Sequence, residues 1–409
     1  MTAFWQDPIT FLRLWLENLL LSWGVSERWV LLIRYAVGAI LLATAALLFV
    51  ILQLWLERKL IGRLQDRLGP NRVGPWGLLQ PIADVLKIFT KEHITPAGAD
   101  RVPFNLAPVL SVAAALMVWA VIPFSATVFG ADLNVGILYL LAVGAVGEIA
   151  IILAGWGSNN KYALLGALRT VAQLISYSVP MTLSALVPVM FSGSLNLNAI
   201  TRAQEVWFIV LAPLPALIFF VASVAEVGRA PFDLPEAESE LVAGYSVEYS
   251  GLKFGFFYVA EFLKAFTVSL IFAVLFLGGW RGPGAEAYPV LGFVYLFLKS
   301  GAVYLLMILF RGTLPRFRID QVMDLNWKVF TPLALILLMV IALVDYFLRG
   351  GLPLVRVLVL LGVNTLAYIV LDRLLSSRER VRRQPVAQPV RPVARPENLI
   401  NPTETGVAS

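Results

Sequence analysis

The residues best suited to chemistry crowd one short stretch between two long apolar segments. From Ala225 to Gly251 the polar members are Glu226, Arg229, Asp233, Glu236, Glu238, Glu240 and Glu248. Carboxylates this close interact, so they gain and lose protons as a coupled group rather than as independent side chains. Two interpretations are open: a solvated acidic surface, or a mobile coupling element whose protonation follows charge changes nearby. The apolar flanks favour the coupling element.

Two prolines predict where the backbone of this acidic stretch is irregular and where a helix begins. Pro231 and Pro235 interrupt regular structure in its first half. The glutamates after Pro235 suit the first turn of a short helix, where the positive end of the helix dipole lies.

Composition determines the fold class. Hydrophobic residues make up 59% of the 409 residues and charged residues 14%, which is too apolar for a soluble globular protein. A helix needs roughly 20 residues to cross about 30 Å of hydrocarbon. The sequence therefore predicts an all-α polytopic membrane bundle of about nine transmembrane helices plus surface amphipathic helices. The expected spans are 29–55, 104–124, 134–156, 162–190, 206–225, 253–279, 288–311, 328–348 and 352–373.

The scarcity of cysteine and histidine limits the cofactors. The sequence has no cysteine and a single histidine, His93, so it lacks the thiolates of an iron–sulfur cluster and the ligand sets of haem or zinc sites. It also lacks the glycine-rich motifs that bind nucleotide phosphates. We expect no cofactor bound by this chain, and any electrons must come from another protein.

The basic residues predict the orientation. A formal net charge of +6 suggests either nucleic-acid binding or membrane topology, and the positive-inside rule favours topology. With the N-terminus outside, most Lys and Arg residues fall in three cytoplasmic loops and the cytoplasmic C-terminus. Those loops are 57–102, 226–252 and 311–328, and we expect them to share one face.

The chain is expected to have four parts. Residues 1–28 form an amphipathic segment at the membrane interface, and 29–348 form an eight-helix membrane domain. Residues 349–374 add one transmembrane helix. The basic, proline-rich residues 375–409 predict a disordered cytoplasmic tail.

The first cytoplasmic loop combines a rigid turn with a second surface helix. Gly-Pro pairs at 69–70 and 74–75 predict irregular backbone. Apolar residues then recur at helical spacing over 78–91, which predicts an amphipathic helix on the membrane surface. A solvated basic loop is the alternative.

Charged residues also stand inside the expected spans: Glu148, Arg169, Glu261, Lys264 and Lys299. Each costs roughly 2.5–3.5 kcal/mol in hydrocarbon, so we expect pairing or a hydrated cavity. Glu261 and Lys264 are three residues apart and share a helix face. These groups either fix helix packing or form a proton relay, in which burial and neighbouring charges adjust the protonation of each carboxylate.

Five motifs in order resemble one known family, the H subunits of bacterial NADH:quinone oxidoreductase (respiratory complex I). The resemblance runs from about residue 30 to 345. The motifs are ERKLIGRLQDRLGPNRVGPWGLLQPIADVLKIFTKE, KYALLGALRTVAQLISY, EVGRAPFDLPEAESELVAGYSVEYSG, FFYVAEF and RGTLPRFRIDQVMDLNWKVFTPLAL.

The resemblance implies a subunit of a proton-translocating enzyme of the bacterial inner membrane. Such a subunit forms much of the quinone-binding tunnel and the first part of a buried proton relay. Quinone is the substrate, while NADH, FMN and iron–sulfur clusters belong to partner subunits. Implied partners are the hydrophilic quinone-pocket subunits, small membrane subunits, quinone and the lipid bilayer, with no nucleic acid.

The resemblance and the residue chemistry together give the candidate sites. The expected quinone contacts are Arg58, Arg67, Asp84, Arg229, Phe232 and Asp233, although an aromatic residue such as Phe232 more often simply packs in a chain of this kind. The expected relay comprises Glu148, Glu226, Glu236, Glu238, Glu240, Glu248, Glu261, Lys264 and Lys299. The chain departs from the family in ISYSVPM, where Ser178 replaces a usual glutamate. A hydrated serine or a carboxylate from another helix must then bridge the gap.

Two other functions remain open from the sequence. One is the membrane anchor of an energy-converting hydrogenase, which shares these motifs. The other is an autonomous cation or proton secondary transporter, which usually shows internal repeats that are not evident here. A transporter purifies alone, whereas a component of complex I purifies with many partners.

Overall fold

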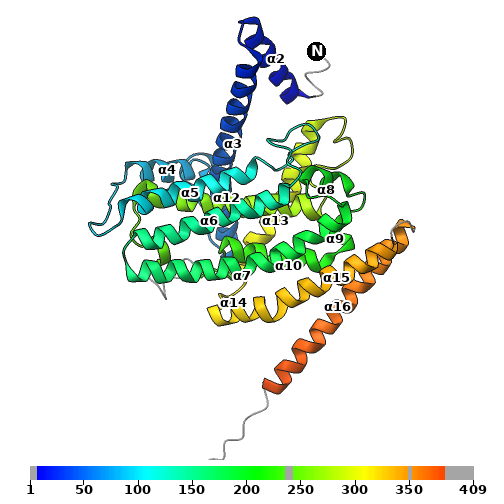
Figure 1. Ribbon diagram of the computed structural model, residues 1–409. Coiled ribbons are helices and arrows are strands. Elements are labelled where there is room, and N and C mark those ends of the chain that lie inside the picture. The colour runs from blue at the N-terminus through cyan, green and yellow to red at the C-terminus, as the bar shows by residue number, and fades with distance from the viewer. Residues whose placement is uncertain (1–6, 235–242, 349–351, 383–409) are drawn as a thin grey trace, which may run out of the picture. The chain divides into compact units, whose positions relative to one another are not determined.

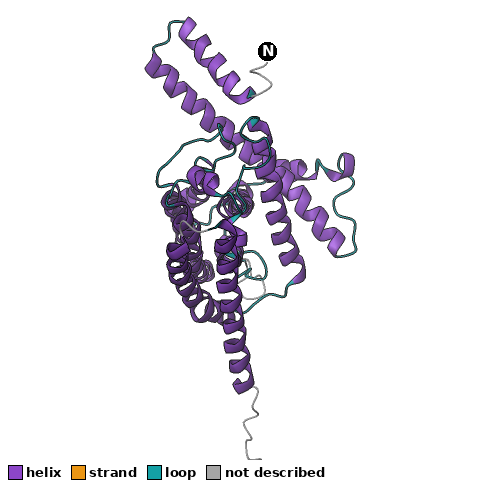
Figure 2. Cartoon of the chain, turned by 90° about the vertical axis from the view of Figure 1, so that its right-hand side faces the viewer, coloured by secondary structure: helices purple, strands orange, loops and turns teal. Residues whose placement is uncertain are grey.

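The computed structural model describes residues 7–234, 243–348 and 352–382 (Figure 1). The chain divides into two compact units, Met1–Thr365 and Leu366–Ser409. Figure 2 shows helices and loops throughout the described part, which contains no β-strand. The predicted all-α membrane bundle is confirmed.

The helices follow in this order: α2 (Pro8–Ser22), α3 (Glu27–Leu64), η1 (Pro75–Gly77), α4 (Gln80–Thr90), α5 (Arg101–Trp119), α6 (Gly136–Gly157), α7 (Lys161–Ser192), α8 (Leu197–Ala203), α9 (Phe208–Leu211), α10 (Pro213–Val227), η2 (Gly244–Ser246), α12 (Gly251–Phe276), α13 (Pro289–Thr313), α14 (Ile319–Leu325), η3 (Asn326–Phe330), α15 (Thr331–Leu348) and α16 (Pro353–Arg382).

Eight helical stretches of the described chain are long and apolar enough to cross a membrane. The expected span 206–225 is different, because it is divided into α9 and the 15-residue α10. Pro213 has no amide hydrogen to continue a helix, and Ala212 before it adopts φ −138°. The prolines of α7, in contrast, lie inside a helix that is continuous over its 32 residues.

The buried side-chain amide of Asn364, on α16, forms hydrogen bonds with the backbone groups left free at the break between α9 and α10. The Nδ2 of Asn364 donates to the carbonyl of Leu211 at 3.2 Å, and its Oδ1 accepts from the amide of Leu214 at 3.4 Å. Asn364 is 1% exposed. Because lipid offers no hydrogen bonds, an interrupted helix in a membrane needs such a partner.

Several helices extend beyond their expected bounds. α3 continues to Leu64, so the start of the expected 57–102 loop is helical. The expected surface helix at 78–91 is present as α4, and the N-terminal amphipathic segment contains α2. The helix expected after Pro235 begins outside the described residues, and the described part of that segment contains the short η2.

Five helices form a closed ring, which we call the five-helix ring. α5 contacts α6, α6 contacts α7, α7 contacts α10, α10 contacts α12, and α12 returns to α5. Of the eight candidate spans, α12 is the most buried, and α3 and α13 also pack against it. Charged groups on α12 therefore lie between the interior of the ring and the helices outside it.

Candidate functional site

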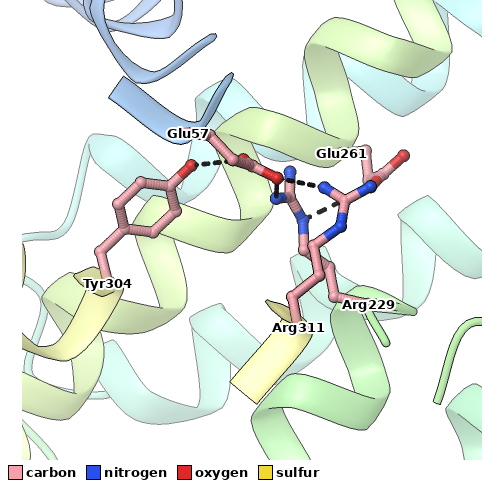
Figure 3. A network of polar contacts seen from close by, with 5 residues as sticks. All are labelled: Glu57, Arg229, Glu261, Tyr304 and Arg311. Carbon is pink, nitrogen blue, oxygen red and sulfur yellow. Dashed lines mark hydrogen bonds and ion pairs between the residues drawn. The ribbon is translucent and has the colours of Figure 1, made fainter. Parts of the chain in front are cut away.

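One carboxylate gathers two arginines and a tyrosine from two other parts of the chain (Figure 3). Glu57 on α3 accepts hydrogen bonds from Arg229 at 2.5 Å and from the hydroxyl of Tyr304 at 3.0 Å. Arg311, near the end of α13, bonds the same carboxylate. We call Glu57, Arg229, Glu261, Tyr304 and Arg311 the arginine cluster.

Arg229 is the centre of this cluster. It follows the C-terminus of α10, where Gly228 adopts a left-handed conformation with φ 74°, and its side chain is 3% exposed. Its Nε lies 3.5 Å from Glu261 Oε1, and its guanidinium covers the Phe262 ring at 4.4 Å. Burial alone lowers the pKa of Arg229, but the charges of Glu57 and Glu261 outweigh it and raise the pKa above the usual arginine value. Arg229 is therefore a permanent buried cation.

A cavity of about 400 Å³ opens beside the arginine cluster. Its polar wall includes Glu57, Arg58, Arg67, Tyr258 and Arg311, and its apolar wall includes Leu54, Ile61 and Phe262. Small-molecule sites combine an apolar wall with convergent polar groups, and this cavity has both. We call it the arginine-cluster cavity.

The predicted quinone contacts fall into two groups. Arg58 and Arg67 line the arginine-cluster cavity, and Arg58 forms an ion pair with Asp84 of α4. The other expected contacts are elsewhere: Phe232 is buried between the rings of Tyr177 and Phe317. Asp233 pairs with Arg316 at 2.7 Å. Phe232 therefore packs as a core residue.

A second group of charges lies inside the five-helix ring. A cavity of about 520 Å³, lined by all five helices, is apolar except at Glu148, Ser178, Thr182, Glu226, Lys264 and Thr267. Three carboxylates act on Lys264 by charge: Glu226, Glu148 and Glu261. We call this the lysine cavity.

Contacts in the lysine cavity are looser than those in the arginine cluster. Ser178 lies 3.4 Å from Glu148 Oε1, at the limit of a hydrogen bond, and donates at 2.8 Å to the carbonyl of Leu174. Glu226 Oε2 is buried and has no hydrogen-bond partner among the described residues. A second carboxylate from another helix thus lies in the same cavity as Ser178.

Glu261 belongs to both groups. It forms its ion pair with Arg229 and interacts through charge with Lys264, one helical turn further along α12. Lys264 thus has Glu261 as a charged neighbour on its own helix and Glu226 and Glu148 as charged neighbours on other helices. One side chain therefore joins the arginine cluster electrostatically to the lysine cavity.

Two more of the predicted relay residues are described, and both lie away from these groups. Lys299 donates to the carbonyls of Gly279 and Arg281 at 3.0 and 2.8 Å, just after the end of α12. Glu248 accepts a hydrogen bond from Asn160 at 2.7 Å in the turn between α6 and α7. The other three, Glu236, Glu238 and Glu240, lie outside the described residues.

Sequence reasoning missed three members of the arginine cluster. Glu57 and Arg311 stand at the ends of expected spans, where charges are the usual sign of topology. Tyr304 is one of many aromatic residues in an apolar helix. One signal for Glu57 was available in the sequence. Glu57 stands directly before Arg58, and a helix that continues past residue 55 places the Glu57 carboxylate within the helical bundle.

Comparison of the sequence with a family model and with known proteins points to the same family in each case. The NADH dehydrogenase family model matches residues 37–342. The NADH-quinone oxidoreductase H subunit of Dehalococcoides mccartyi is 48% identical over 340 residues, covering 83% of this chain and 93% of the relative. The chain belongs to the family of NADH-quinone oxidoreductase H subunits. Its relative in Anoxybacillus flavithermus is 50% identical over 76% of this chain and 94% of the relative. The relative in a Geobacillus species is 48% identical over 77% and 95%.

Membership in this family makes the chain one component of a membrane enzyme complex. It is a multi-pass membrane protein, and its partners are other subunits of that complex. The family model ends at residue 342, so α16, with the buried Asn364, lies beyond it.

Proposed function

We propose that this protein forms part of the quinone-binding tunnel and begins the relay that couples quinone reduction to proton translocation. The proposal rests on the position of Glu261, which contacts Arg229 and interacts with Lys264. A charge change at one group is therefore felt at the other through a single side chain.

The arginine-cluster cavity supplies the quinone part of the proposal. Leu54, Ile61 and Phe262 offer an apolar wall for the ring and tail, while Arg58 and Arg67 offer polar contacts for the headgroup. Arg229 holds a fixed positive charge behind this wall. A quinone that gains electrons and takes up protons changes the charge that Glu261 experiences.

The lysine cavity supplies the relay. Lys264, Glu226 and Glu148 interact by charge within one mostly apolar space, where electrostatic interactions are stronger than in water. A change in the charge of Glu261 changes how readily Lys264, Glu226 and Glu148 hold a proton. Glu236, Glu238, Glu240 and Glu248 remain candidates for the proton entry side.

The arrangement in the membrane follows from the same proposal. The ends of α3, α10 and α13 that form the arginine cluster face the cytoplasm of the inner membrane, with the N-terminus outside. Hydrophilic subunits holding FMN and iron–sulfur clusters complete the quinone pocket there and deliver electrons from NADH. This chain binds none of those cofactors.

Photo-crosslinking tests the quinone site. The assembled complex is illuminated with an azido-quinone, and labelled peptides of this protein are mapped by mass spectrometry. We expect labels within 29–91 and 226–262, and excess unlabelled quinone should suppress them. Labels confined to other segments would contradict the proposed tunnel.

A Glu261→Gln substitution tests the relay. The amide keeps the shape of the side chain but removes the charge that faces Arg229 and Lys264, so coupled proton translocation should be lost. The measurement is acidification by the assembled complex in proteoliposomes. Glu286→Gln, an exposed carboxylate after α12, is the matched control. Pumping retained in Glu261→Gln would remove this residue from the relay.

A further inference from the structure

A third cavity, with a volume of about 570 Å³, lies where α5 and α7 end and α6 begins. Its wall comes from α2, the α5–α6 connection and residues around α8. Neither the quinone tunnel nor the relay includes these residues. A volume in this range holds a small organic ligand.

Two arginines line this cavity from separate elements, Arg13 on α2 and Arg202 on α8. Arg202 is exposed, and the side chain of Arg13 is 50% exposed and 3.9 Å from Glu17. Guanidinium groups bind phosphate oxygens with a planar pair of donors. The cavity is therefore suited to a phosphate ester.

One carboxylate lies in the same wall. Asp132 accepts a hydrogen bond from Asn196 at 2.6 Å, and it is the only acidic side chain among the described residues that line this cavity. Asp132 is exposed, whereas the Oδ1 of the neighbouring Asn198 is fully buried and out of reach of a ligand. A ligand that carries a positively charged N–H donor beside its phosphate therefore fits both Asp132 and the two arginines.

α2 places apolar surface beside the polar cavity. Leu12, Leu14 and Trp15 are about half exposed, as expected of a helix at a membrane interface. Asp7 caps α2 and accepts a hydrogen bond at 2.8 Å from Thr127 in the α5–α6 connection. This contact fixes the helix at the rim of the cavity.

We propose that this cavity binds the headgroup of phosphatidylethanolamine. The phosphate lies between Arg13 and Arg202, the ammonium donates to the carboxylate of Asp132, and the acyl chains follow the apolar side chains of α2. A choline headgroup has no N–H to donate, and a glycerol headgroup brings no positive charge to Asp132. The site is thus a lipid site distinct from the quinone tunnel.

Lipid binding to the assembled complex tests this proposal. The complex is delipidated, incubated with phosphatidylethanolamine vesicles, and its bound lipid is measured by mass spectrometry. Arg13→Gln with Arg202→Gln should weaken retention of one lipid at least tenfold. Both side chains are exposed, so the fold should not change. Arg28→Gln, an exposed arginine of α3 outside the cavity, should retain lipid normally.

Specificity tests the ammonium contact separately. Phosphatidylcholine and phosphatidylglycerol should each bind the wild-type site at least tenfold more weakly than phosphatidylethanolamine. Asp132→Asn, which keeps an acceptor for Asn196 but removes the negative charge, should reduce this preference. Equal binding of all three lipids, or equal retention by the double arginine variant, would overturn the proposal. Displacement of the lipid by soluble phosphoethanolamine at equal concentration would overturn its assignment to a lipid rather than a free phosphate ester.

Discussion

The arginine cluster and the lysine cavity bury similar charges in opposite ways. In the cluster, Glu57 bonds two arginines and a tyrosine directly. In the cavity, Lys264 and the carboxylates of Glu148 and Glu226 interact across a mostly apolar space, and one oxygen of Glu226 has no hydrogen-bond partner among the described residues. Nε and Nη2 of Arg229 also have no hydrogen-bond partner among the described residues, so the two regions differ in whether their charges bond directly to one another.

Because of this difference, the two regions are suited to different functions. Arginine keeps its proton in proteins, while a buried lysine can release its own. Direct hydrogen bonds to Glu57 also hold Arg229, Tyr304 and Arg311 in place. The arginine cluster is therefore suited to fixing geometry and a constant charge, and the lysine cavity is suited to exchanging protons. Glu261 lies between a fixed cation and an exchangeable one.

Removing the charge of Glu57 should have the largest effect. Glu57→Gln leaves the buried Arg229 and its neighbour Arg311 without their shared anion, and breaking a buried pair costs about 3–5 kcal/mol. We expect loss of this protein from the purified complex, or a clear fall in its thermal stability, measured by native electrophoresis and thermal unfolding.

An exposed ion pair provides the control for Glu57. Lys328 and Asp324 lie 2.7 Å apart with side chains 59% and 60% exposed, and such pairs contribute about 0.3–0.5 kcal/mol. Asp324→Asn should therefore leave assembly unchanged. If Glu57→Gln behaved like Asp324→Asn, the arginine cluster would not be the fixed region.

A glycine beside Lys264 allows the lysine cavity to be disturbed without changing any charge. A Cβ at Gly147 would lie 2.8 Å from Lys264 Nζ, so Gly147→Ala should displace the ammonium while keeping α6 helical. We expect proton translocation to fall roughly 10- to 100-fold, the scale of small misplacements of reacting groups. The measurement is acidification in proteoliposomes, with assembly checked by native electrophoresis.

Gly144 on the same helix is the matched control. A Cβ there would lie 3.9 Å from Glu226 Oε1, an ordinary contact. Gly144→Ala should therefore pump protons close to the wild-type rate. Equal pumping by Gly147→Ala and Gly144→Ala would show that the position of Lys264 does not matter.

The same two regions show what a sequence can predict. The lysine cavity was largely foreseeable, because Glu148 and Lys264 stand alone in apolar runs where a charge is costly. The arginine cluster was only partly foreseeable, because Glu57 and Arg311 lie at helix ends, where charges also report topology. Which carboxylate meets Arg229 depends on how α3, α12 and α13 pack, and no local pattern contains that information. Phe232 shows the same limit, since an aromatic residue suits either a cavity wall or a core.

Ser178 should give the smallest effect and the finest test of the lysine cavity. Its hydroxyl has one proton, and the carbonyl of Leu174 at 2.8 Å is a nearer acceptor than Glu148 at 3.4 Å. Ser178→Ala therefore removes at most a weak contact with Glu148, worth less than about 1 kcal/mol. Proton translocation and thermal stability should match those of Thr182→Ala, which removes a neighbouring hydroxyl of the same cavity. A loss of pumping in Ser178→Ala alone would mean that this hydroxyl carries protons itself, and the lysine cavity would then depend on a directly bonded path like that of the arginine cluster.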